Sequence, residues 1–225
     1  MSLNRHLLET RPGSPEKRPD PPRVAWRKQM REQVLQEAWS LASHHGWDRV
    51  RVADLAQRAG VSRPSIYAEF GNRAGIGQAL VHREAERFLT EVAIVLTSHR
   101  DDVHAALEAG VGHALAEAAR NPFIRAVITA ARGGTDALLP FLTSRPEPVF
   151  SGGRQLVAAW LADVLPRTVE HRRGDAADIV VRLTLSHMLL PSHDRREAAK
   201  QVARAASALL ETAVAPHPSP KEHTQ

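Results

Sequence analysis

Residues Val52–Arg73 read VADLAQRAGVSRPSIYAEFGNR, and they predict two short helices joined by a tight turn. Apolar residues in the first half have the i, i+3, i+4, i+7 spacing of one helix face: Val52, Leu55, Ala56 and Ala59. Gly60 follows at once and predicts the end of the first helix, because a residue without Cβ readily adopts the left-handed conformation that closes many helices.

The second helix is expected to begin after Ser62, a residue type that caps helix N-termini well. Pro64 lies in its first turn, where a missing N–H costs nothing. Ile66 and Phe70 share one face, which can pack on the first helix, while the N-terminal end stays exposed. Two such helices form a helix-turn-helix, in which the second helix reads bases. The alternative is a helical hairpin inside an ordinary α-domain.

The run Ala59–Arg73, AGVSRPSIYAEFGNR, resembles the signature of the tetracycline-repressor (TetR) family of transcriptional regulators. The resemblance extends upstream to Met30, through an alanine-rich helix ending in Gly46-Trp47-Asp48, and covers about a fifth of the chain. It implies that Arg63, Pro64 and Ser65 face the major groove and that Tyr67 and Arg73 hold phosphates. The predicted DNA-binding residues are Arg27, Lys28, Arg51, Ser62, Arg63, Pro64, Ser65, Tyr67 and Arg73.

Two positions depart from the family pattern. Arg51 stands just before the first helix of the motif, where the family often has Thr or Ser. Near Ala68 and Glu69 the family often has an aromatic residue or His, and a carboxylate there adds nothing to phosphate binding.

The composition is that of a globular protein, with 225 residues, 43% hydrophobic and 24% charged. The absence of cysteine excludes disulfides, thiolate metal sites and thiol nucleophiles. The sequence contains neither a signal-peptide pattern nor an apolar run of about 18 residues, so a soluble cytoplasmic protein with no membrane partner is expected.

Residues 1–22 predict a disordered arm, because they are polar and rich in proline. From Met1 to Arg31 the chain has eight Lys/Arg against three Asp/Glu, an excess equal to the formal net charge of +5. Such an arm can follow phosphates or enter a minor groove. It can equally be a solvated tail, and the sequence leaves both interpretations open.

The remaining pattern is helical, with no strand pattern, and predicts an all-α chain. A three-helix DNA-binding domain is expected at residues 23–74, a larger effector-binding and dimerisation body at 75–215, and a disordered tail at 216–225. Outside the motif, the expected helices are Ala25–His45, Arg73–Ser98, one from Asp101-Asp102 to Arg120, one from Asn121-Pro122, Thr135–Leu142, Val149–Leu165, Ala176–Leu190 and Arg195–Val214, with a loop at Ser144–Pro148 and a polar connection at Pro166–Asp175.

The chemistry-bearing residues favour binding over catalysis. No metal-ligand spacing, catalytic constellation or phosphate-binding loop occurs, so no metal, cofactor or enzyme activity is expected. Four aromatic residues of the body are either core or the lining of an effector cavity, with His187 as a possible polar contact: Phe123, Phe141, Phe150 and Trp160.

The resemblance implies a small-molecule effector and a homodimer through the last two helices. The alanine-rich final helix suits such an interface, because it permits close helix approach. The sequence therefore predicts a repressor that leaves a palindromic double-stranded operator when a mostly apolar effector binds. The alternatives are an effector-independent architectural or occlusion protein of the same fold, and an enzyme with a DNA-binding head.

Overall fold

The computed structural model describes residues 21–133 and 149–211, and throughout them the only regular structure is helical. The elements are α1 (Pro21–His45), the 3₁₀ turn η1 (Trp47–Arg49), α2 (Val52–Arg58), α3 (Arg63–Phe70), α4 (Arg73–Ser98), α5 (Val103–Arg120), α6 (Pro122–Gly133), α8 (Val149–Val164), α9 (Glu170–Leu189) and α10 (Arg195–Glu211). The predicted all-α class is confirmed. The expected helix Thr135–Leu142, the loop after it, Phe141, most of the N-terminal arm and the tail lie outside these residues.

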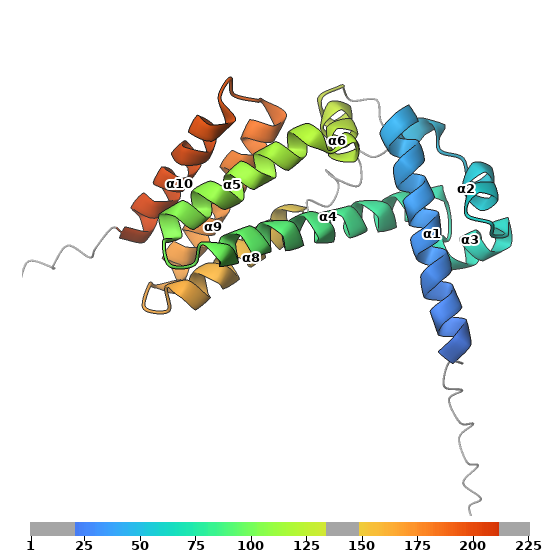
Figure 1. Cartoon of the computed structure of the whole chain (residues 1–225), viewed down its shortest axis with the longest axis horizontal. Coiled ribbons are helices and arrows are strands. Elements are labelled where there is room, and N and C mark those ends of the chain that lie inside the picture. The colour runs from blue at the N-terminus through green and yellow to red at the C-terminus, as the bar shows by residue number, and fades with distance from the viewer. Residues whose placement is uncertain (1–20, 134–148, 212–225) are drawn as a thin grey trace, which may run out of the picture.

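The helices form two units that share α4 (Figure 1). We call α1, η1, α2 and α3 the head, and α5, α8, α9 and α10 the body. The apolar core of the head includes Leu35, Trp47, Leu55 and Ile66, each at most 1% exposed. It also takes in side chains from beyond the predicted boundary at residue 74: Ile76, Leu80 and Val81 of α4, and Phe123 of α6. The core of the head is therefore completed by the first turns of α4 and by α6, which follows the first helix of the body.

Two helices begin earlier than the sequence predicts. The first starts at Pro21 rather than Ala25, inside the stretch expected to be disordered, because prolines are tolerated in a first turn. The other, α9, starts at Glu170 rather than Ala176. Nη1 of Arg173 donates to the carbonyls of Leu165 at 3.1 Å and Thr168 at 2.6 Å, which ties the new helix to the turn before it. Much of the predicted polar connection is thus helical.

Gly75 lets α4 start directly against the end of α3. A Cβ at this position would lie 1.9 Å from the carbonyl oxygen of Phe70, far inside van der Waals contact. The side chain of Asn72 caps the new helix by accepting the N–H of Gly75 at 2.9 Å. Gly75 therefore has a steric role, because only glycine fits between the two helices.

The alanine-rich face of α10 packs inside the chain. Ala198, Ala199, Ala203 and Ala206 are at most 2% exposed, and the helix lies against α5 and α9. The expectation that these alanines face a second subunit is therefore wrong, because the close approach they permit is used between helices of one chain.

Candidate functional site

The turn of the predicted helix-turn-helix is closed as its sequence suggests. Gly60 has a φ of +65°, and the N–H groups of Gly60 and Val61 donate to the carbonyls of Gln57 and Ala56 at 3.4 and 3.0 Å. This pair of bonds is the glycine-dependent helix ending that satisfies the last carbonyls of α2. Ser62 then caps α3, because its Oγ accepts the N–H of Ser65 at 3.2 Å.

The second helix of the motif, α3, is polarised in the way a recognition helix requires. Ile66 and Phe70 are buried at 0% and 8% exposure, whereas Arg63, Pro64 and Tyr67 are exposed. The hydroxyls of Ser62 and Ser65, two other predicted DNA-binding residues, lie 2.8 Å apart and are hydrogen-bonded to each other. Lys28 and Arg51 are exposed as well, and Arg51 occupies the N-cap of α2 without a side-chain capping bond.

Arg73 has internal partners that the sequence did not suggest. Its Nε donates to the carbonyl of Val50 at 2.8 Å, and its guanidinium also bonds to the carbonyl of Trp47. The same group lies 5.0 Å from the centre of the Trp47 ring, a cation–π contact. Arg73 thus fastens the start of α4 to η1, and these two bonds hold its guanidinium within the head.

Glu69 binds two arginines of α1, which sequence reasoning also missed. Its Oε1 accepts from Nη1 of Arg31 at 3.0 Å, and Nε of Arg27 bonds to Oε2. The Arg31 guanidinium also lies 5.1 Å from the centre of the Phe70 ring. The i, i+4 spacing of Arg27 and Arg31 was a signal that both face one side of α1. We call Arg27, Arg31 and Glu69 the α1–α3 clamp.

The predicted effector residues that the structure describes do not line one cavity. Phe123 is 3% exposed and belongs to the core of the head, so its prediction as a body-cavity residue is wrong. Its place follows from the corner between α5 and α6, which brings the first turn of α6 against α1. Trp160 lies in the core of the body, and the guanidinium of Arg182 covers the half-buried Phe150 at 4.7 Å.

An apolar slot lies instead between α4, α5, α8 and α9, and it encloses about 60 Å³. Its walls include Phe88 and Val92 of α4, Ala114 of α5 and Leu156 of α8. The polar Thr184 also lines it, but its hydroxyl donates to the carbonyl of Val180 at 2.6 Å. A ligand in this slot would therefore meet almost only hydrocarbon.

His187 lines a second, wider cleft of about 940 Å³ between α5, α6 and the turn that joins α9 to α10. Its Nδ1 is hydrogen-bonded to the hydroxyl of Ser192 at 2.8 Å. Arginines border the same cleft, although the sequence showed no basic cluster there: Arg125, Arg195 and Arg196. Met188 lines both the cleft and the slot, so the two adjoin at this flexible side chain.

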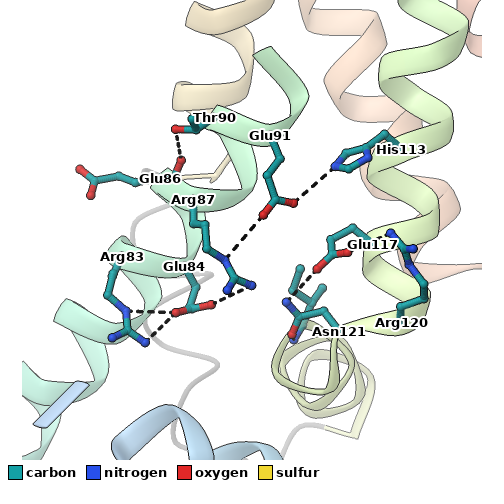
Figure 2. A network of polar contacts seen from close by, with 11 residues as sticks. Arg83, Glu84, Glu86, Arg87, Thr90, Glu91, His113, Glu117, Arg120 and Asn121 are labelled. Atoms are coloured by element: carbon teal, nitrogen blue, oxygen red, sulfur yellow. Dashed lines mark hydrogen bonds and ion pairs between the residues drawn. The ribbon is translucent and has the colours of Figure 1, made fainter. Parts of the chain in front are cut away.

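A network of charged and polar side chains runs along α4 and reaches α5 (Figure 2). Glu84, whose side chain is 7% exposed, pairs with Arg83 at 2.8 Å and Arg87 at 3.5 Å. Arg87 also contacts Glu91, and Glu91 in turn lies 3.5 Å from His113 of α5. The buried residues of the head core lie on one side of this network and those of the body core on the other, so α4 contributes to two separate apolar cores.

Neither a metal site nor a membrane span occurs in the part of the chain that the structure describes. No cluster of His, Asp or Glu there has the arrangement of a metal site. None of the described helices is long and apolar enough to cross a membrane.

Comparisons with known proteins match both units. A profile described as "Bacterial regulatory proteins, tetR family" matches residues 34–80. A second, "Bacterial Tetracyclin repressor, C-terminal domain", matches residues 102–208.

Individual proteins agree with the profiles. The transcriptional regulator AlkX of Mycobacterium tuberculosis is 27% identical over 80% of this chain and 84% of its own length. The repressor ComR of Escherichia coli is 32% identical over 34% of this chain and 37% of its own. The crystal structure of the TetR-family repressor AlkX from a Dietzia strain, implicated in n-alkane biodegradation, superposes with a TM-score of 0.63 at 27% identity, covering 80% of this chain and 94% of that one.

Proposed function

Because the chain belongs to the TetR family of DNA-binding transcriptional regulators, we propose that it is a repressor released from a palindromic operator by a small, mostly apolar effector. The observation that carries the effector part of this proposal is the hydrocarbon-walled slot beside α4. The first turn of that helix lies against the C-terminal end of α3, because Gly75 approaches the carbonyl of Phe70.

In the proposed DNA complex, the exposed N-terminal end of α3 enters the major groove. Arg63 is the candidate for a bidentate contact to guanine, which contributes about 1–3 kcal/mol of base discrimination. Tyr67, Lys28 and Arg51 are exposed and suited to phosphates. Arg73 contributes chiefly by holding α4 to η1, since its guanidinium already bonds to two carbonyls there.

A homodimer through α9 and α10 is part of the proposal. One head reads few base pairs, whereas two heads related by symmetry read half-sites about one helical turn apart, or a multiple of it. Leu183 of α9 and Leu190, at the C-cap of the same helix, are separated by two turns and are 37% and 76% exposed. These leucines, rather than the buried alanines of α10, are the proposed apolar contacts with the second subunit.

The size of the slot suggests how an effector acts. Pockets for small ligands usually measure about 300–1,000 Å³, and the slot encloses about 60 Å³. An effector must therefore widen it by displacing one of the four helices that form its walls, and α4 is one of them. It can release DNA only if it binds the displaced arrangement more tightly, because equal affinity for both shifts nothing.

The effector class we propose is a hydrocarbon chain or ring with few polar groups. The slot walls are apolar, and the related Dietzia repressor is implicated in n-alkane biodegradation. Any polar end would emerge past Met188 into the cleft that holds His187. An architectural protein without an effector is the alternative, and a body without a slot would have favoured it.

The test combines operator release with the fluorescence of Trp160, which lies in the body core. Trp160→Phe identifies the contribution of this residue to the emission, so the buried Trp47 of the head need not be replaced. Members of a panel of alkanes, alkanols and fatty acids of equal chain length should change the Trp160 emission. They should weaken operator binding over the same range of concentrations.

A slot-filling variant locates the effector. Ala114→Leu should abolish both responses while leaving operator binding intact, because the added carbons occupy the slot. Ala159→Leu, on the exposed face of α8, is the matched control and should respond like wild type. Release by phosphorylated metabolites, undiminished in Ala114→Leu, would contradict the apolar-effector proposal.

A further inference from the structure

The α1–α3 clamp places a carboxylate on the helix proposed to read DNA. Glu69 lies in the last turn of α3, and its side chain is only 7% exposed because the guanidiniums of Arg27 and Arg31 cover it. A negative charge beside the phosphate backbone opposes binding. Its presence on a recognition helix therefore calls for an explanation other than affinity.

The two arginines would be effective phosphate ligands without Glu69. Their side chains are 64% and 38% exposed, and α1 is exposed at every residue from 22 to 29. Long, flexible cations of this kind supply most of the affinity for DNA of any sequence, because each phosphate contact releases counterions. Charge-assisted bonds to Glu69 instead hold both guanidiniums at one place on α3.

We propose that Glu69 is a specificity-determining positioning residue, which makes phosphate contact by Arg27 and Arg31 conditional on the seating of α3 in the major groove. In a loose, sequence-independent complex the clamp holds both arginines on the protein and cancels one of their charges. When α3 is seated on its operator, the guanidiniums already lie at the groove edge and use their remaining donors on phosphates. The clamp therefore lowers non-specific affinity more than operator affinity.

This inference rests on the proposed role of α3 as the recognition helix. The experiment uses the full chain with two duplexes, one of random sequence and one operator selected by the protein from a random pool. Affinity for each is measured between 50 and 200 mM salt, a range over which phosphate contacts change DNA affinity by large factors, of about 10³–10⁵ for six to ten contacts.

In Glu69→Gln the salt slope on random DNA should steepen by up to about 0.9 for each freed arginine. Operator affinity should change less, so the ratio of operator to random affinity should fall. Adding Arg27→Gln and Arg31→Gln to that variant should return the slope on random DNA to wild type or below it. Thermal melting verifies that each variant is folded.

The matched control is Glu37→Gln. It breaks the 3.5 Å ion pair between Glu37 of α1 and Arg58 of α2, which also joins α1 to the motif. An equally steep slope in this control would overturn the assignment to Glu69, and so would an unchanged slope in Glu69→Gln. If Glu69→Gln lost operator affinity without a steeper salt slope on random DNA, the clamp would be a structural contact only. If Arg63→Ala leaves operator selectivity intact, the proposed role of α3 itself fails, which is a separate outcome.

Discussion

Replacing Gly75 with alanine tests whether α4 positions α3, the proposed recognition helix. The new Cβ would lie 1.9 Å from the carbonyl oxygen of Phe70, whereas ordinary contact begins at 3.4 Å, so α3 and α4 must separate by about 1.5 Å. Overpacking of this kind destabilises the folded chain by about 1–3 kcal/mol. The higher helix propensity of alanine relative to glycine stabilises it by about 1 kcal/mol. The net loss is up to about 2 kcal/mol, or roughly 4–8 °C in Tm for a chain of this size.

Operator affinity should fall further than stability alone explains, because the displaced end of α3 carries Glu69 and Phe70. Circular dichroism melting and fluorescence anisotropy on labelled operator measure the two effects. The control is Gly174→Ala in the interior of α9, where a Cβ meets nothing within 4 Å. It should gain up to about 1 kcal/mol and bind operator normally. If Gly75→Ala melts and binds like Gly174→Ala, the steric reasoning is refuted.

Three other predictions concern the arm, the dimer and the joint between head and body. Deleting residues 1–20, which leaves α1 intact, should reduce the salt slope by up to about 0.9 for each phosphate that the arm binds, and an unchanged slope would make the arm an inert tail. Leu183→Glu should give a monomer in light scattering at micromolar concentration and weaken palindrome binding, whereas a dimer that persists would place the interface elsewhere. Phe123→Ala should cost about 3–5 kcal/mol of head stability, seen as a lower Tm and weaker operator binding. If Phe123→Ala instead lost its response to the effector and kept the wild-type Tm, Phe123 would belong to the effector site.

The helices and the turn between Val52 and Arg73 could be predicted from the sequence, because each feature that determines them acts over only a few residues. Apolar spacing sets the helix faces, Gly60 supplies the positive φ, and Ser62 supplies the cap. For the same reason the caps Asp102 and Asn121 were visible in advance, and the side chain of each accepts backbone N–H groups at the start of the next helix. The family resemblance followed from this same local signal.

The slot that we propose for the effector could not be predicted from the sequence, because its walls come from four helices whose packing brings distant residues together. The predicted lining relied on aromatic residues, and hydrophobicity alone does not say which core a side chain enters. Phe123 entered the head core because the corner after α5 turns α6 toward α1. The alanines of α10 became internal packing for the same kind of reason.

The same distinction holds for the charged residues: local sequence predicts the exposure of some, whereas the partners of others depend on tertiary packing. The sequence identified Arg63 as exposed at the start of α3, since exposure there follows from the polarity of one short helix. The partners of Arg73 and Glu69 depend on where η1 and α1 lie, across 26 and 38 positions of sequence for the bonds to Trp47 and Arg31. Local periodicity carries no information over such separations, so only the packed structure distinguishes an arginine that holds the fold from one that is available to DNA.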